Sequence, residues 1–155
     1  MTAPILIFAW GNPSRGDDAL GPLFAERLEP LLADPARFEF LTDFQLQVEH
    51  ALDLQGRAGV IFVDADASLE EPFRFDPLEA EEDASFSTHA LSPRAVLHVY
   101  QELNDTTPPP AWLLAIRGES FELGEPMSAA AQGALDEALN WFRDWLKDLK
   151  SVQQA

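Results

Sequence analysis

The sequence contains no cysteine among its 155 residues. Thiol nucleophiles, disulfide bonds and thiolate metal sites are therefore excluded as the basis of its function. The absence also suits a reducing compartment. The N-terminus, Met-Thr-Ala-Pro, has no basic segment followed by a full apolar stretch, so no signal peptide is predicted. We expect a cytoplasmic protein.

Basic residues are also scarce, because 10 Lys and Arg stand against 27 Asp and Glu, which gives a formal charge of -17. Such a charge repels nucleic acid and anionic membranes. No apolar run approaches the length needed to span a membrane. We therefore expect neither a nucleic-acid partner nor a membrane partner. A cation or a basic partner is the more natural ligand, although most of the acids are expected to form a solvated surface.

Several familiar motifs are missing. Asn12-Pro13 follow Gly11, which does not fit the dinucleotide fingerprint G-x-G-x-x-G, and the Gly-Lys-Ser/Thr of a P-loop does not occur. The G-x-S-x-G elbow and the H-E-x-x-H zinc motif are also absent. These absences argue against a phosphate-binding loop, a Ser/His/Asp hydrolase and a helical zinc protease.

What the sequence does contain is an alternation of β-prone and helical segments. Apolar runs predict strands at 5–9, 59–63 and 112–116, with another strand at 37–41 and a short edge strand at 73–75 between two prolines. Helical spacing is found over 20–31, 46–54 and 93–103, and from 128 onward, where Trp141 and Trp145 are predicted to pack. The alternation predicts one α/β domain over residues 1–155, with a mostly parallel sheet covered on both faces.

Acidic residues come directly after three of the predicted strands. Asp17 and Asp18 follow the first strand, Asp43 the second and Asp64 the third. Ligands of open parallel sheets bind at the edge formed by the carboxyl ends of the strands, so these acids are expected to converge on one crevice. One acid of the Asp17-Asp18 pair can serve as the N-cap of the next helix, but a pair exceeds what capping requires.

Histidine supplies the next candidate ligand. His89 lies in the loop before Ser92-Pro93, where serine is expected to cap a helix that starts with proline. His98 falls inside that helix, and His50 is interpreted as a surface residue. Two carboxylates and the imidazole of His89 form an oxygen and nitrogen donor set suited to nickel, zinc or another divalent transition ion.

Four elements, in this order, resemble the endopeptidases that mature the large subunit of nickel-iron hydrogenases. They are the segment 5–21 with its Gly-Asn-Pro and Gly-Asp-Asp elements, the triplet 63–65, His89 before Ser92-Pro93, and the segment 118–128 that leads into the last helix. The resemblance implies a three-layer α/β/α fold with a mostly parallel, twisted sheet. It also implies removal of a short C-terminal extension from a hydrogenase large-subunit precursor after nickel insertion. We expect a monomer.

The resemblance assigns the metal-contacting carboxylates to Asp18 and Asp64 and the metal-contacting histidine to His89. Some relatives have glutamate at the first position, so Asp18 has a shorter reach. Asp17 and Asp43 are the nearby carboxylates that could move protons, and all five residues are candidate catalytic groups. The nickel is implied to arrive in the substrate, so the ligands would recognise a loaded precursor. Whether the metal activates water or only registers the substrate tail stays open.

One departure and several alternatives remain. Many relatives have a glycine-rich turn after the acid that matches Asp43, whereas this chain has the segment 44–47, Phe-Gln-Leu-Gln. That segment resembles the branch serving soluble NAD-reducing hydrogenases. The main alternative is a non-catalytic acidic metal-binding module or metallochaperone, and an aspartic protease whose adjacent acids share a proton is another. A response-regulator-like receiver fits poorly, since Arg117-Gly118 stand where its lysine would follow the last strand.

Overall fold

The computed structural model describes residues 2–81 and 91–154 of the chain. Within these ranges the strands are β1 (Ile5–Trp10), β2 (Phe38–Asp43), β3 (Gly59–Asp66), β4 (Phe73–Leu78) and β5 (Ala111–Arg117). The helices are α1 (Leu20–Leu32), α2 (Pro93–Asn104) and α3 (Ala129–Gln154), together with the short 3-10 helices η1 (Gly16–Ala19) and η2 (Val48–Leu54). Every strand and helix predicted from the sequence is therefore present.

The strands form one sheet in the order β2-β1-β3-β5-β4. The pairs β1 with β2, β1 with β3, and β3 with β5 are parallel, and only β4 runs antiparallel, at the edge. The predicted α/β fold with a mostly parallel sheet is confirmed. The predicted edge strand is confirmed too, but its end was wrong: β4 runs through Pro77, which pairs with Trp112. Proline is tolerated in a strand at a sheet edge, because the partner strand lies on one side only.

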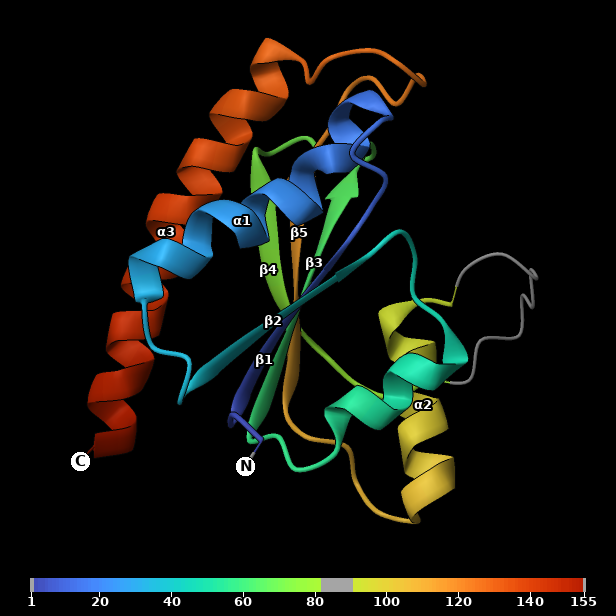
Figure 1. Cartoon of the computed structure of the whole chain (residues 1–155), viewed down its shortest axis with the longest axis vertical. Helices are drawn as coiled ribbons and strands as arrows, with labels where there is room; N and C mark the ends of the chain where they lie inside the picture. Colours follow the sequence, from blue (N-terminus) through green and yellow to red (C-terminus); the bar gives the residue numbers. More distant parts are fainter. Residues whose placement is uncertain (1, 82–90, 155) are drawn as a thin grey trace.

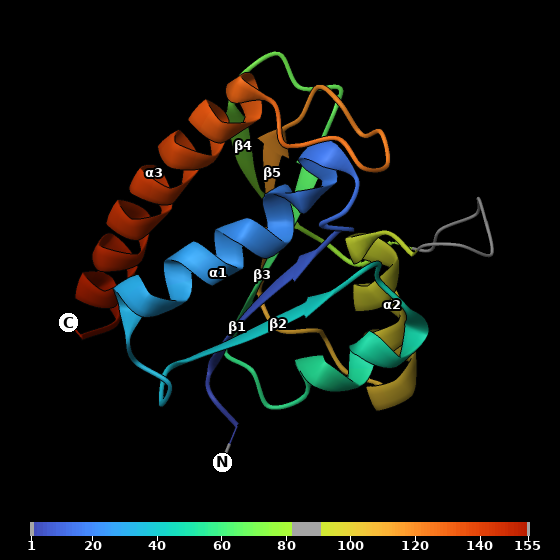
Figure 2. The same ribbon diagram turned by 45° about the horizontal axis from the view of Figure 1, so that its top comes forward.

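Helices cover both faces of the sheet (Figures 1 and 2). One face packs against α1 and α3 through a core that includes Ile7, Phe24 and Phe142. The other face packs against η2 and α2, where Phe8 and Val96 are buried. Residues of β1 alternate between these two cores, as expected for a strand that is covered on both sides. The arrangement has the three layers of an α/β/α fold.

The helix boundaries follow from local sequence signals. Ser92 accepts the amide of Ala95 at 3.1 Å and so caps α2, which starts at Pro93 as predicted. α1 begins at Leu20, as predicted, but the expected capping side chain is absent. Its N-cap is Ala19 and no side chain caps it, so neither Asp17 nor Asp18 has the capping role that the sequence allowed.

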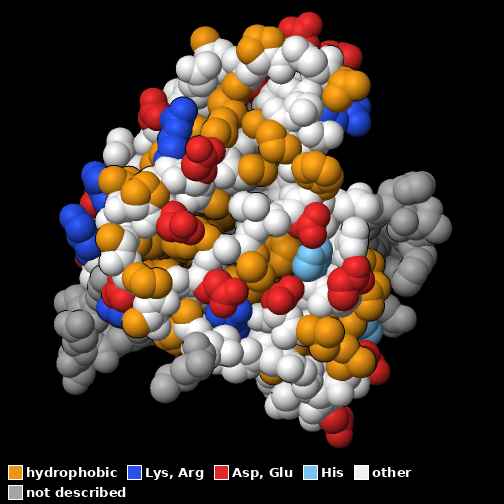
Figure 3. Space-filling view, viewed as in Figure 1, with side chains coloured by type: hydrophobic (Ala, Val, Ile, Leu, Met, Phe, Trp, Pro, Cys, Tyr) orange, Lys and Arg blue, Asp and Glu red, His pale blue; other side chains and the backbone are white. Residues whose placement is uncertain are grey.

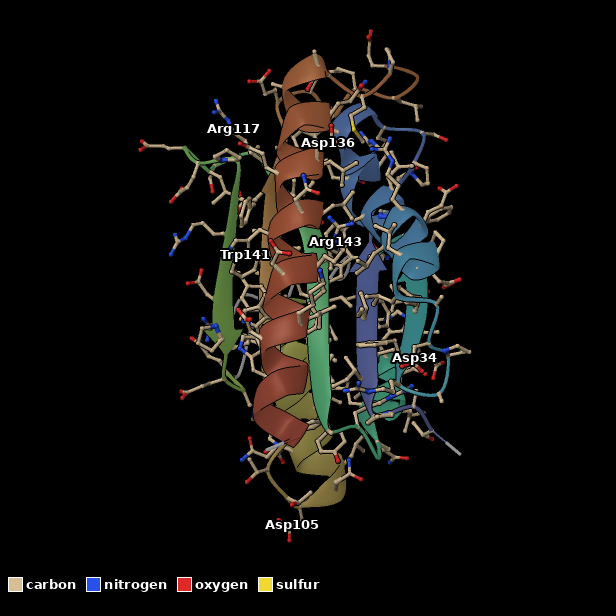
Figure 4. All side chains as sticks on the ribbon, turned by 90° about the vertical axis from the view of Figure 1, so that its left-hand side faces the viewer. Asp34, Asp105, Arg117, Asp136, Trp141 and Arg143 are labelled. Carbon is tan, nitrogen blue, oxygen red and sulfur yellow. The ribbon has the colours of Figure 1, made fainter. Side chains whose placement is uncertain are left out.

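The aromatic residues of α3 pack against the edge of the sheet. Phe75 of β4 lies 4.7 Å from Trp145 and 5.1 Å from Trp141, measured between ring centroids. Figure 4 shows α3 in front of the sheet, with Trp141 on the side of β4 and Arg143 on the side of α1. The interpretation of Trp141 and Trp145 as packing residues is therefore confirmed.

Among the helices in the described ranges, none combines the length and apolar character of a membrane span.

Candidate active site

Asp43, Trp10 and Asp64 form a row across three neighbouring strands. Trp10 pairs with Asp43 in the register of β1 and β2, and its indole N–H donates to the carboxylate of Asp64 on β3. The row faces the layer of η2 and α2, as does Phe8, which is two residues before Trp10 on β1. The row lies at the carboxyl end of β1, which has β2 on one side and β3 on the other. Open α/β sheets bind ligands at such a point, where the strand order reverses direction.

Asp64 has few groups that stabilise its charge. Its pKa is raised to about 7, mainly by burial and also by the negative charges of Asp18 and Asp66, while hydrogen bonds from the Ala65 amide and from Trp10 oppose the rise. The amide of Ala65 lies 2.8 Å from the carboxylate. In the part of the chain that the structure describes, no basic side chain pairs with Asp64 or Asp18. Such a carboxylate favours a proton or a bound cation.

The position of Asp64 differs from the prediction. The sequence placed it after a strand that ends at Val63, but β3 continues to Asp66. The neighbouring β5 extends to Arg117, which pairs with Asp66. Pairing with β5 therefore keeps residues 64–66 in the strand. Asp64 is therefore carried by a strand and not by a loop, which fixes its direction toward the η2 and α2 layer.

Asp18 reaches the site from the loop between β1 and α1. Its Oδ2 accepts the amide of Asn12 at 2.7 Å, and its charge acts on Asp64. Gly11 has φ +147°, and a Cβ at this position would lie 2.0 Å from the carbonyl oxygen of Asp18. Only glycine permits the loop to approach so closely. The structure thus brings Asp18 and Asp64 together from separate elements.

Asp17, in contrast, is turned away from solvent and is fully buried. Its carboxylate accepts the amides of Glu119, Ser120 and Ser128 and the hydroxyl of Ser128, at 2.7 to 3.0 Å. Burial raises the pKa of Asp17, but these hydrogen bonds outweigh burial, and the net pKa is below its usual value. Asp17 is not the free carboxylate that the sequence suggested, and its contacts favour a structural role that ties η1 to the loop before α3.

Asp43 lies at the end of β2 beside His50. His50 Nε2 is 3.1 Å from Asp43 Oδ2, and the amide of Phe44 donates to Asp43 Oδ1 at 2.7 Å. The interpretation of His50 as a surface residue was wrong, because it is only 9% exposed and packs edge-on against Phe8. Its burial depends on contacts with β1 and β2 that lie outside its own segment. The sequence held one local signal for the position of His50. Gln47 and His50 are three residues apart, which is the spacing of a capping box at the start of a helix.

His89, the third predicted metal ligand, lies outside the described residues. The described chain resumes at Leu91, whose amide donates to the carbonyl of Leu46 at 3.4 Å, on the same face as the acidic row. Across residues 2–81 and 91–154, no group of three histidine, aspartate or glutamate side chains is arranged to hold a metal ion. The metal assignment of Asp18, Asp64 and His89 stays a prediction.

A groove of about 230 Å³ opens beside Asp43. Its walls come from the loop after β1, the start of α1 and the end of β2, and they comprise Gly11, Pro13, Pro22, Thr42, Asp43 and Phe44. Phe44 is 68% exposed at this groove. An apolar wall next to a half-exposed carboxylate suits an extended peptide segment better than a small ion.

Acidic side chains are spread over the molecular surface around these elements. Figure 3 shows one face of the molecule, on which red Asp and Glu side chains are scattered and blue Lys and Arg side chains are fewer. The pattern agrees with the formal charge of -17. It favours an approaching partner that is basic or carries a cation.

Comparison with solved structures gives close matches over nearly the whole chain. A [NiFe] hydrogenase maturation protease, HycI from Thermococcus kodakarensis KOD1, is 27% identical, with a TM-score of 0.68, over 94% of this chain and 93% of that one. The solution structure of an endopeptidase from Escherichia coli is 25% identical, with a TM-score of 0.67, over 93% and 92%. The hydrogenase maturating endopeptidase HybD from E. coli is 23% identical, with a TM-score of 0.70, over 93% and 92%.

Neither the family models nor the curated proteins give a match to this chain. The solved structures alone test the resemblance to hydrogenase maturation endopeptidases that the four sequence elements indicated. They confirm it.

Proposed function

We propose that the chain, which is similar in structure to [NiFe] hydrogenase maturation proteases, is a peptidase that removes the C-terminal extension from a nickel-loaded hydrogenase large-subunit precursor. The cut would be made at the carboxyl edge of the sheet, between the acidic row and the groove beside Asp43. We further propose that the chain acts as a monomer in the cytoplasm.

The observation that carries this proposal is the pair Asp18 and Asp64. Two carboxylates from separate elements raise each other's energy, and the pKa of the partly buried Asp64 is about 7. A divalent cation would relieve this repulsion, and carboxylate oxygens with one imidazole form a donor set that nickel and zinc accept. Asp18, Asp64 and His89 would hold the ion of the substrate. A bound ion of this kind polarises a carbonyl or lowers the pKa of water.

The other residues of the site would orient the substrate and move a proton. Asp43 is 44% exposed in its side chain and lines the groove, so it can accept a proton from an attacking water. Phe44 and Pro13 offer apolar walls to an extended substrate segment. Trp10 holds the carboxylate of Asp64 through its indole N–H. We assign Asp17 to the support of this site, because its hydrogen bonds are all internal.

The choice of hydrogenase follows from the segment after Asp43. Phe44 and its neighbours to Gln47 are bulkier than a glycine-rich turn, and Phe44 projects at the groove. This supports a substrate from the branch of soluble NAD-reducing hydrogenases, whose precursor would meet a narrower groove than one lined by glycine.

The test is processing of purified precursor, followed by the mass of the product. We expect the nickel-loaded precursor to be shortened and the nickel-free precursor to stay intact. Cleavage of both forms would contradict recognition of nickel but not the peptidase assignment. Failure on both, with retained binding of nickel, would instead support the non-catalytic metal-binding module.

Site variants sharpen the test. We expect Asp64→Asn and His89→Ala each to abolish processing of the loaded precursor. Asp76→Asn is the matched control for the first, because Asp76 lies on β4 at the sheet edge and is 54% exposed in its side chain. Normal processing by Asp64→Asn would remove that residue from the site.

A further inference from the structure

We infer that His50 is a positioning residue, whose imidazole fixes the orientation of the Asp43 carboxylate at the carboxyl end of β2. The inference rests on the proposed function, in which Asp43 takes a proton from the attacking water. It adds a residue that the sequence interpretation had assigned to the surface. The three hydrogen bonds that carry it involve both ring nitrogens of His50 and both carboxylate oxygens of Asp43.

The hydrogen bonds of His50 define its tautomer. The backbone N–H of Gln47 donates to His50 Nδ1 at 2.8 Å, so this nitrogen must act as an acceptor and carries no proton. A neutral imidazole then has its proton on Nε2. That nitrogen lies 3.1 Å from Asp43 Oδ2, so the Nε2–H donates to the carboxylate. Because this donor is neutral, the carboxylate of Asp43 keeps its negative charge. Asp43 can therefore still accept a proton.

The ring of His50 has little freedom to turn away. It is 9% exposed and packs edge-on against Phe8, with the ring centroids 4.6 Å apart and an angle of 74° between the planes. Its own amide is bound by the side chain of Gln47, which completes the capping box at the start of η2. The donor that reaches Asp43 is therefore held by both β1 and the first turn of η2.

Asp43 is restrained at the same time from its other side. The amide of Phe44 donates to Oδ1 at 2.7 Å, and the carbonyl oxygen of Asp43 accepts the amide of Gly11 at 3.0 Å. With His50 on Oδ2, both carboxylate oxygens have a fixed donor, yet the side chain stays 44% exposed at the groove. A carboxylate oriented in this way loses little freedom when it meets a water and a peptide.

The rival role for His50 is that of a cap alone, which accepts the Gln47 amide and stabilises η2. Two variants separate these roles. His50→Asn places a carbonyl oxygen near the position of Nδ1 and keeps the acceptor for Gln47, but its amide is too short to reach Asp43. His50→Gln places an amide donor near the position of Nε2, so it keeps the contact with Asp43 and gives up the cap.

Processing rates at saturating nickel-loaded precursor test the inference. We expect His50→Asn to lower kcat about 10- to 100-fold with little change in KM, and His50→Gln to retain most of the activity. In an Asp43→Asn background, neither variant should lower kcat further, since His50 acts through Asp43. Wild-type kcat in His50→Asn, or additive losses in the double variant, would overturn the inference.

Nitrogen NMR of the wild-type imidazole gives a readout that needs no substrate. We expect the proton on Nε2, and a shift of the Nε2 resonance in Asp43→Asn. A proton on Nδ1 would overturn the inference. If the wild-type chain cuts no precursor, the proposed function fails and takes the inference with it. If the wild type cuts and His50→Asn is as active, the inference alone fails.

Discussion

Ser128 binds Asp17 twice, donating its amide to one carboxylate oxygen at 2.7 Å and its hydroxyl to the other at 2.8 Å. Ser128 is followed directly by α3, and its hydroxyl oxygen also accepts the amide of Ala131 at 3.2 Å. One buried carboxylate thereby connects the segment after β1 to the start of the last helix. Because Asp18 is the next residue in the chain, this connection supports the candidate site without entering it.

Replacement of Asp17 by asparagine should destabilise the fold. The new amide nitrogen would face a backbone or hydroxyl donor, because each carboxylate oxygen now accepts from Glu119, Ser120 or Ser128. We expect Asp17→Asn to lower the free energy of unfolding by ~3 kcal/mol, as measured by chemical denaturation. Asp136→Asn, with a side chain that is 68% exposed, is the matched control and should change it by less than ~0.5 kcal/mol. Equal stability of the two variants would contradict the supporting role of Asp17.

The contribution of Asp17 should also depend on pH. Burial raises its pKa and hydrogen bonds lower it more, so the folded-state pKa lies below the usual value of 3.8. The folded chain therefore binds this proton less readily than the unfolded chain. The contribution of Asp17 is fully present above that usual pKa and is lost as the pH falls through the folded-state pKa. The difference in unfolding free energy between wild type and Asp17→Asn should shrink below about pH 4, and a constant difference in acid would contradict this.

Local patterns were sufficient to predict most of the fold. The apolar runs of β1 and β3 are buried on both faces, as uncharged strands in a covered parallel sheet must be. Ser92-Pro93 indicated the start of α2, because capping by serine and the fixed φ of proline act within one turn. These features depend on residues that are close in sequence. Each strand or helix could therefore be predicted from its own segment alone.

Long-range contacts account for what the sequence could not predict. The donors to Asp17 come from residues 102 to 111 positions further along the chain, so nothing near Asp17 indicated that it would be buried. His50 is buried because Phe8 and Asp43 lie on strands that meet only after folding. Asp64 belongs to β3 because β5 extends beside it. Strand-end acids were therefore found from the pattern, but their individual roles depend on the tertiary structure.

The first loop of the site should tolerate no side chain at Gly11. A Cβ there would lie 2.0 Å from the Asp18 carbonyl oxygen, and φ is +147°, so Gly11→Ala must displace the loop that carries Asp18. We expect a loss of ~3 kcal/mol or more in unfolding free energy. The matched control is Gly133→Ala in α3, where nothing lies within 4 Å of the added Cβ, and it should gain ~0.5–1 kcal/mol. Thermal unfolding of both variants measures this, and a harmless Gly11→Ala would refute the close approach.

Asp64 should reduce stability when it is ionised. Its folded-state pKa of about 7 lies above the unfolded value of 3.8, mainly because of burial, with further rises from Asp18 and Asp66. Between those values the folded chain keeps a proton that the unfolded chain releases, so stability falls as the pH rises through this window and stays low above it. Asp64→Asn removes the charge. With a chelator present, we expect the variant to be more stable than wild type by ~1–3 kcal/mol at pH 8, with the gain fading toward pH 4.

Chemical denaturation of both proteins across this pH range gives the comparison, and Asp76→Asn serves as the control because it removes a charge from the edge strand β4. The gain in stability should be accompanied by loss of precursor processing, since a residue kept for cation binding is costly when no cation is present. If Asp64→Asn were no more stable than wild type at pH 8, the ionised carboxylate would already be satisfied by the protein. Asp64 would then have no need of a cation, and the argument that pairs it with Asp18 around an ion would fail.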